Sequence, residues 1–124
     1  MSEAAVAPHI AQGLYFIGED EAGVVGVFRF QREDRVFWPE MEEGTSAYLH
    51  KLAVLPARQG HEAAQGLLAC ACDLARARGL RFLRLDCIGG RPSLRGVYER
   101  FGFRHHSDRV LGRTTFHRFE LELS

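Results

Sequence analysis

Several residue types and sequence features are rare or missing in this chain of 124 residues. It holds a single lysine, Lys51, and three cysteines. Nowhere does it contain the run of about 20 apolar residues that a membrane-spanning helix needs. Its first residues, MSEAAVAPHIAQ, lack the basic stretch followed by an apolar stretch that marks a secretion signal. We therefore expect a cytoplasmic protein that has no membrane partner.

An excess of charge of one sign is also missing. The 16 acidic residues balance the 16 basic ones, so the formal net charge is +0 at pH 7. Proteins that bind nucleic acid through its phosphates usually carry a clustered basic surface or a strongly basic domain. The balance gives no reason to expect a nucleic-acid partner, and we predict none.

The cysteines do not suggest a disulfide framework. Cys70 and Cys72 are two residues apart in a segment with helical periodicity, about 200° around the helix, so they cannot share one disulfide or one metal ion. Cys87 follows a strand-like segment. Small buried thiols in a reducing compartment are the simplest interpretation.

What the chain does contain is typical of one globular domain. Apolar residues make up 46% of it and charged residues 26%, and 124 residues suffice for one hydrophobic core but not for two. We expect a flexible lead-in over residues 1–12 and a single domain over 13–124.

Hydrophobic patterning predicts a mixed α/β domain. Two β-rich runs with an acidic turn between them indicate a hairpin, and later apolar residues alternate between strand and helix spacing. The predicted order is β-β-β-α-β-α-β-β, with strands or helices at 13–20, 22–31, 47–54, 61–78, 80–88, 92–101, 103–107 and 114–123.

Three segments, taken in order, resemble the GNAT superfamily of N-acetyltransferases. They are YLHKLAVLPARQGHEAAQGLL, RFLRLDC and RPSLRGVYERFGF. The third is the most specific, because a helix with Tyr-Glu-Arg followed by Gly-Phe recurs in that superfamily. The resemblance covers residues 13–123. It implies a mixed, mostly antiparallel sheet with one splayed parallel pair of strands, shortened at the amino-terminal end.

The resemblance also implies a site for acetyl-CoA in the splay. Its pantetheine arm would meet the unpaired backbone of Leu52, Ala53 and Val54, much as an added strand does. Its pyrophosphate would lie over the start of the helix near residue 61, where free N–H groups and the helix dipole favour anions. Arg91 stands where the family commonly has an asparagine that contacts pantetheine.

The phosphate-binding turn departs from the family's pattern, [Q/R]-x-x-G-x-[G/A]. Six residues occupy it here: Gln59, Gly60, His61, Glu62, Ala63 and Ala64. Glu62 replaces the central glycine, which puts a side chain and a negative charge where phosphate would approach. Arg58 and His61 could offset that charge. The alternative is that Glu62 faces solvent and simply favours the first helical turn, as acids do.

Residue roles follow from the same resemblance. A tyrosine on the helix at 92–101 serves the family as the general acid, and here it is Tyr98. The strand position where members often carry a glutamate base holds His50, whose imidazole can accept a proton near neutral pH. Asp86, at a strand end, is an alternative base. A structural role remains open for each of the three.

A loop at 32–46 would border the acceptor. Phe37 and Trp38, followed by Glu40, Glu42 and Glu43, could form an aromatic and acidic mouth for a cationic amine. The alternative is that the aromatic side chains cap the core and the acids are simply solvated.

No metal site is predicted. His105 and His106 are neighbours on a strand and should point to opposite faces, which is poor geometry for holding one ion.

The strand and helices with which the family usually begins have only twelve residues in their place. Truncation, a wall supplied by a second subunit, or an open acceptor site would each account for this. Exposed apolar surface and an open sheet edge favour pairing, so we expect a homodimer.

The predicted function is transfer of acetyl from acetyl-CoA to a primary amine of a small molecule or peptide. The alternative is a catalytically weak CoA-binding or dimeric regulatory module that retains the fold.

Overall fold

The computed structural model describes residues 6–12, 14–89 and 92–123. A short 3₁₀ helix at Pro56–Arg58 precedes α1. The other elements, in chain order, are β1 (Ala7–Gln12), β2 (Tyr15–Asp20), β3 (Gly23–Gln31), β4 (Ser46–Val54), α1 (His61–Ala77), β5 (Phe82–Ile88), α2 (Pro92–Phe101), β6 (Arg104–Leu111) and β7 (Thr114–Glu122).

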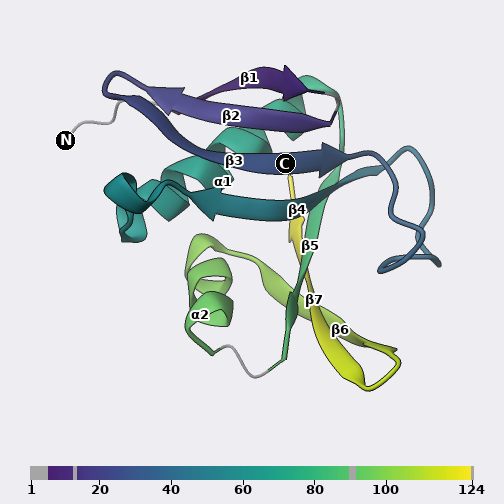
Figure 1. Ribbon diagram of the computed structural model, residues 1–124. Helices are drawn as coiled ribbons and strands as arrows, with labels where there is room; N and C mark the ends of the chain where they lie inside the picture. Colours follow the sequence, from purple (N-terminus) through teal and green to yellow (C-terminus); the bar gives the residue numbers. More distant parts are fainter. Residues whose placement is uncertain (1–5, 13, 90–91, 124) are drawn as a thin grey trace.

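Within the described residues the strands form a seven-stranded sheet in the order β1-β2-β3-β4-β5-β7-β6. Among these described strands only the pair β4–β5 is parallel, and α1 makes the crossover that parallel neighbours require. Figure 1 shows α1 behind the strands at the amino-terminal side, with α2 beside the lower end of β5. The mixed, mostly antiparallel fold predicted from the sequence is confirmed.

One expectation about the lead-in is wrong. Residues 7–12 form β1, which pairs antiparallel with β2, placing His9 opposite Ile17 and Ile10 opposite Phe16. Without β1, the backbone of β2 would be the open edge of the sheet. The pairing therefore orders a segment whose composition alone suggested no structure.

The core lies between α1 and the sheet. Leu67, Leu68, Ala71 and Ala75 recur at helical spacing and are fully buried. Gly79, with a φ of +73°, follows the end of this helix in the left-handed conformation that glycine adopts readily. None of the helices among the described residues is long and apolar enough to cross a membrane.

Two glycines allow α1 to lie close to the sheet. A Cβ added to Gly18 would lie 2.6 Å from Cδ1 of Leu67. One added to Gly26 would lie 2.3 Å from the carbonyl oxygen of Ala53 and 2.9 Å from Cδ2 of Leu67. Gly26 is paired with Val54 in the β3–β4 ladder. Its lack of a side chain lets the backbone of β4 at Ala53 lie close to β3.

The parallel pair separates part of the way along. β4 and β5 are paired from Ser46 opposite Phe82 to Leu49 opposite Leu85, and no further, although both strands continue. The β3–β4 register shifts between Arg29 and Val27, which inserts an extra residue into β4. Lys51 lies in that bulge with a φ of +55°. Bulges bend a strand, and here the bend carries β4 away from β5.

We predict that Gly26→Ala lowers the free energy of unfolding by about 1–3 kcal/mol, the usual cost of overpacking a core. The added methyl group meets a backbone carbonyl, which cannot move aside as a flexible side chain can. The matched control is Gly96→Ala in α2, whose added Cβ would lie 3.6 Å from the Arg100 guanidinium and whose helix should gain up to about 1 kcal/mol. Urea unfolding of both variants is the measurement; equal stability of Gly26→Ala and wild type contradicts the packing argument.

Candidate active site

The splay leaves one edge of β4 open beyond Leu49. From His50 to Val54 the strand still pairs with β3 on one side, but β5 has turned away on the other. Backbone N–H and C=O groups on that side are available to a ligand that enters the splay. Leu52, Ala53 and Val54 lie on this part of the strand, with Leu52 and Val54 half-buried and Ala53 exposed.

The start of α1 follows the open edge of β4 in the chain, after the short 3₁₀ helix. Gly60, with a φ of +148°, precedes the helix and offers no side-chain cap to it. The first helical backbone bond runs from the N–H of Ala64 to the carbonyl of Gly60, so the N–H groups of His61, Glu62 and Ala63 have no partner further back in the helix. Such a terminus favours anions.

Gln59 fastens this turn to the strand. Its side-chain amide donates a 2.8 Å hydrogen bond to the carbonyl of Val54, which fixes the distance between the open edge of β4 and the start of α1. His61 and Glu62 are exposed. The six residues predicted from Gln59 to Ala64 therefore do surround one helix N-terminus.

Arg58 does not face the turn. Its guanidinium pairs with the Asp20 carboxylate, a hydrogen bond that holds the pKa of Asp20 below its usual value, and donates to the carbonyl of Val24 at 3.2 Å. It is therefore engaged with the β2–β3 turn, and the hypothesis that it offsets the charge of Glu62 is wrong.

His50 lies between two carboxyl groups on the opposite face of the sheet from α1. Its Nε2 is 2.7 Å from Oδ2 of Asp34, and its Nδ1 is 3.8 Å from Oδ1 of Asp86. Burial opposes ionisation of Asp34, but the hydrogen bonds from His50 and from the N–H of Phe37 outweigh it, so the pKa of Asp34 lies below its usual value. With its Nε2–H donated to Asp34, the ring presents the lone pair of Nδ1 toward Asp86.

Asp86 itself is held in an unfavourable place for a charge. Its Oδ1 is buried and receives no hydrogen bond within the part of the chain that the structure describes. Burial, with a further contribution from the nearby charge of Asp34, raises the pKa of Asp86 to about 6. A carboxyl group with that pKa exchanges protons close to neutral pH, as acid–base groups of enzymes do.

Tyr98 lies on α2, the helix that Figure 1 shows beside the lower end of β5. It is 6% exposed and packs against the rings of Phe103 and Phe119. Burial, together with the charges of Cys87 and Asp86, raises its pKa to about 12. The phenol therefore keeps its proton throughout the neutral range.

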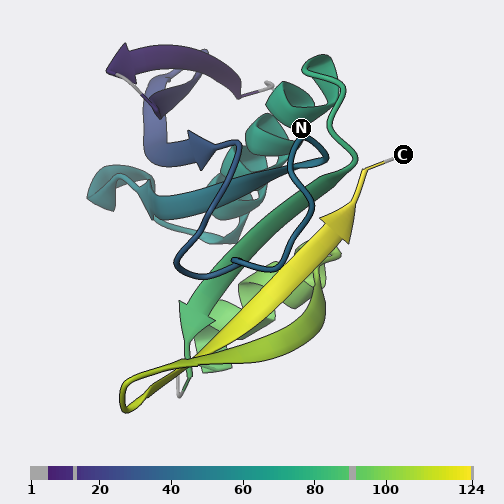
Figure 2. The same ribbon diagram turned by 90° about the vertical axis from the view of Figure 1, so that its right-hand side faces the viewer.

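The β3–β4 loop covers the face that carries His50 (Figure 2). Trp38 is 2% exposed and lies between two arginines, with the Arg118 guanidinium 4.6 Å and that of Arg84 5.4 Å from its ring. Arg118 in turn binds Glu40 at 2.7 Å. Trp38 is therefore buried under the loop, on the other face of the sheet from the core that lies against α1.

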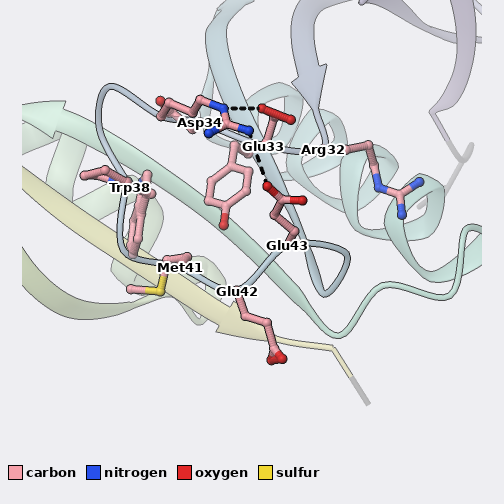
Figure 3. Close-up of a pocket in the computed structure, with 10 residues that line it drawn as sticks. Arg32, Glu33, Asp34, Trp38, Met41, Glu42 and Glu43 are labelled. Carbon is pink, nitrogen blue, oxygen red and sulfur yellow. Dashed lines mark hydrogen bonds and ion pairs between the residues drawn. The ribbon is translucent and has the colours of Figure 1, made fainter.

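Phe37 does border the site. Its ring centroid lies 5.7 Å from that of His50 and 4.9 Å from that of Phe116. The loop also lines a pocket made mainly of charged residues, among them Glu33, Asp34 and Glu43 (Figure 3). Both glutamates bind Arg35, at 2.8 and 3.3 Å. These exposed pairs contribute little to stability, so their charges mainly set the local field.

Sequence reasoning missed Asp34. It lies sixteen residues before its partner His50, inside a polar loop, and no spacing or motif links the two. Asp86 entered only as an alternative base. Arg91 lies outside the described residues.

A comparison with family models matches residues 3–103 to the GNAT acetyltransferase family. The chain belongs to this family. No curated protein sequence matches it.

Solved GNAT structures share the fold. An acetyltransferase of the family from Listeria monocytogenes is 26% identical with a TM-score of 0.72, over 89% of this chain and 64% of that one. The protein yncA of Salmonella typhimurium, solved with acetyl-CoA, is 19% identical with a TM-score of 0.66, over 89% and 64%. A variant of the spermidine N-acetyltransferase SpeG of Vibrio cholerae is 19% identical with a TM-score of 0.69, over 88% and 63%. The chain thus spans less than two thirds of the length of each.

We predict that the stability gap between the wild type and Asp86→Asn depends on pH. The pKa of Asp86 rises from 3.8 to about 6 on folding, so its contribution is fully present below a pH of about 4 and is lost as the pH rises through about 6. At about 1.36 kcal/mol per pKa unit, the wild type should lose up to about 3 kcal/mol relative to the variant. Urea unfolding across this pH range measures the difference in unfolding free energy between the two proteins. A difference that stays constant, or that shifts in favour of the wild type as the pH rises, contradicts the burial argument.

We predict that Glu62→Gly tightens the binding of acetyl-CoA by at least about tenfold, or about 1.4 kcal/mol. The change removes a carboxylate from a helix start that otherwise attracts phosphate. Glu62→Ala removes the charge but keeps a Cβ, so comparing the two by isothermal titration separates repulsion from steric hindrance. If neither variant binds more tightly than the wild type, the carboxylate does not face the phosphates.

Proposed function

We propose that the protein transfers acetyl from acetyl-CoA to a primary amine of a small molecule or peptide. The observation that carries the proposal is the splay, in which an open edge of β4 leads directly to an uncapped helix N-terminus. An extended amide-bearing arm that ends in a pyrophosphate is complementary to that sequence of donors and acceptors. Acetyl-CoA supplies the activated acyl group and a thiolate leaving group.

Leu52, Ala53 and Val54 would hold the amide-bearing arm through their backbone groups. The first turn of α1, Gln59–Ala64, would hold the pyrophosphate. Gln59 contributes by positioning, because its amide joins the end of β4 to that turn.

His50 is proposed as the base that removes the proton from the acceptor amine. Asp34 orients the ring by accepting the Nε2–H, so Nδ1 is the nitrogen left to accept a proton. The imidazolium that forms would lie between the carboxyl groups of Asp34 and Asp86, which favours it electrostatically.

Tyr98 is proposed as the acid. An ordinary thiol has a pKa of about 8.5, so full proton transfer from a phenol with a pKa of about 12 is uphill by roughly 4.8 kcal/mol. Tyr98 therefore acts chiefly by donating a hydrogen bond to the developing thiolate, which stabilises the charge where it forms.

The acceptor is proposed to be cationic before it reacts. Residues 32–45 contain five acidic residues and two arginines, and this loop covers the face that carries His50. A negative field near the site raises the local concentration of protonated amines. Spermidine, the substrate in the name of the related SpeG protein, belongs to this class of amine.

A homodimer and a cytoplasmic location stay predictions. The exposed side chains of Val36 and Val110, 58% and 61% accessible, offer apolar surface for a second copy. β1 and β6 end the sheet at its two edges.

The activity is tested by incubating the protein with acetyl-CoA and a panel of primary amines, including spermidine and a peptide, and measuring the free thiol released. Thiol release that depends on the amine supports the proposal. Binding of acetyl-CoA with no turnover of any amine would instead favour a CoA-binding module without catalysis.

For Tyr98→Phe we predict that kcat falls about 100-fold, the order of magnitude expected for loss of one hydrogen bond to a charge that develops in the transition state. The Kd of acetyl-CoA should stay unchanged, because the ring still fills its place against Phe103 and Phe119. Tyr48→Phe is the matched control, since Tyr48 is equally buried but its hydroxyl accepts a hydrogen bond from Arg84. An unchanged kcat in Tyr98→Phe would exclude this tyrosine as the acid.

A further inference from the structure

The hairpin of β6 and β7 gathers two imidazoles and a carboxylate on one surface. Nε2 of His105 lies 2.8 Å from Oδ1 of Asp108, and Nδ1 of His117 lies 2.7 Å from the same oxygen. One nitrogen from each ring and one carboxylate oxygen all lie within 4.8 Å of one another.

A bulge brings these residues together. The β6–β7 register shifts between His105 and Ser107, so the usual alternation of side chains is broken at His106. His105 and Asp108, three apart, therefore share a face that strict alternation would deny them. Asp108 lies directly opposite His117 in the ladder. This is why the neighbouring histidines alone gave no indication of a metal site.

His106 is not part of this cluster. Its Nδ1 lies 2.8 Å from Oγ of Ser107, and its ring lies 5.3 Å from that of Trp38, on the face covered by the β3–β4 loop. The cluster of His105, Asp108 and His117 is thus on the other face of the sheet from His50 and Asp34.

The ring of His117 is held in position from behind. A Cβ added to Gly89 would lie 3.1 Å from Nε2 of His117, so the absence of a side chain there admits the ring. The N–H of Gly89 donates a 2.9 Å bond to the carbonyl of Thr115, which fixes this strand end against the hairpin. The ring therefore presents Nδ1, and not Nε2, to the other two residues.

We propose that His105, Asp108 and His117 bind a divalent transition-metal ion of the Zn²⁺ class. Two imidazole nitrogens and one carboxylate oxygen are the donors such ions take, at about 2.0–2.2 Å each. In a tetrahedral site these lengths put the donor atoms about 3.3 Å apart, so the two nitrogen–oxygen distances of 2.8 and 2.7 Å would each lengthen by only about 0.5 Å around an ion. Asp108 has room to do so, because its side chain is 47% exposed.

Three protein donors leave the fourth position of such an ion open to water or to a small ligand. The ion would replace the two hydrogen bonds that now meet at one oxygen of Asp108, and would tie β6 to β7 next to Gly89. The proposal does not depend on acetyl transfer, since none of its residues belongs to the splay.

Isothermal titration of untagged protein with Zn²⁺ tests the site. We expect one equivalent to bind, and His105→Ala and His117→Ala each to weaken binding at least tenfold. His106→Ala is the matched control, because it removes a histidine from the same bulge but from the other face, and it should leave the affinity unchanged. Asp108→Asn keeps the shape of the carboxylate and should also weaken binding.

Co²⁺ gives a second readout that reports coordination directly. The wild type and His106→Ala should develop the intense visible absorption of tetrahedral Co²⁺, and His105→Ala should not. Circular dichroism without metal shows that each variant is folded before it is compared. Equal affinity in the wild type and the cluster variants, or a loss in His106→Ala as large as in His105→Ala, would overturn the proposal.

Discussion

Hydrogen bonding between β4 and β5 stops after Leu49 and Leu85, and the rest of the site depends on that interruption. The cause is local, an extra residue in β4 that leaves Lys51 with a φ of +55°. A non-glycine residue in that region is uncommon and costs free energy, so the surrounding ladder must hold it there. β3 does so, because it pairs with β4 on both sides of the bulge.

Everything that the proposed reaction needs lies around this opening. The open edge of β4 continues through the Gln59 contact to the start of α1, where phosphate would bind. Tyr98, on α2, is proposed to meet the thioester from the side of the helices, while His50 projects from the other face of β4, just before the bulge. The buried Trp38, held between Arg84 and Arg118, anchors the loop that brings Asp34 to His50. The packing of Trp38 thus positions the side chains that are proposed to react on this face of the sheet.

The sequence predicted the elements well where periodicity is strong. The helix at 92–101 has the bounds expected for it, and α1 ends one residue earlier than predicted. The splay, by contrast, was expected only from the family resemblance. β1 was missed because a short edge strand is decided by pairing with β2, which its composition does not reveal. Asp34 was missed because only the folded loop brings it to His50, and Arg58 was misassigned because its partner, Asp20, lies 38 residues away. Bulges, which place both Lys51 and Asp108, leave no pattern in a single sequence.

Hydrogen exchange at the amides of residues 50–54 and 61–63 tests the central claim most directly. In the free protein the amides of residues 50–54 that do not pair with β3 face the open side of the splay, and those of residues 61–63 begin α1 without a helical partner, so water can reach both groups. Adding acetyl-CoA should slow exchange in both segments together and leave the β6–β7 hairpin unaffected. If saturating acetyl-CoA changes exchange in neither segment, the splay is not a binding site and the account is wrong.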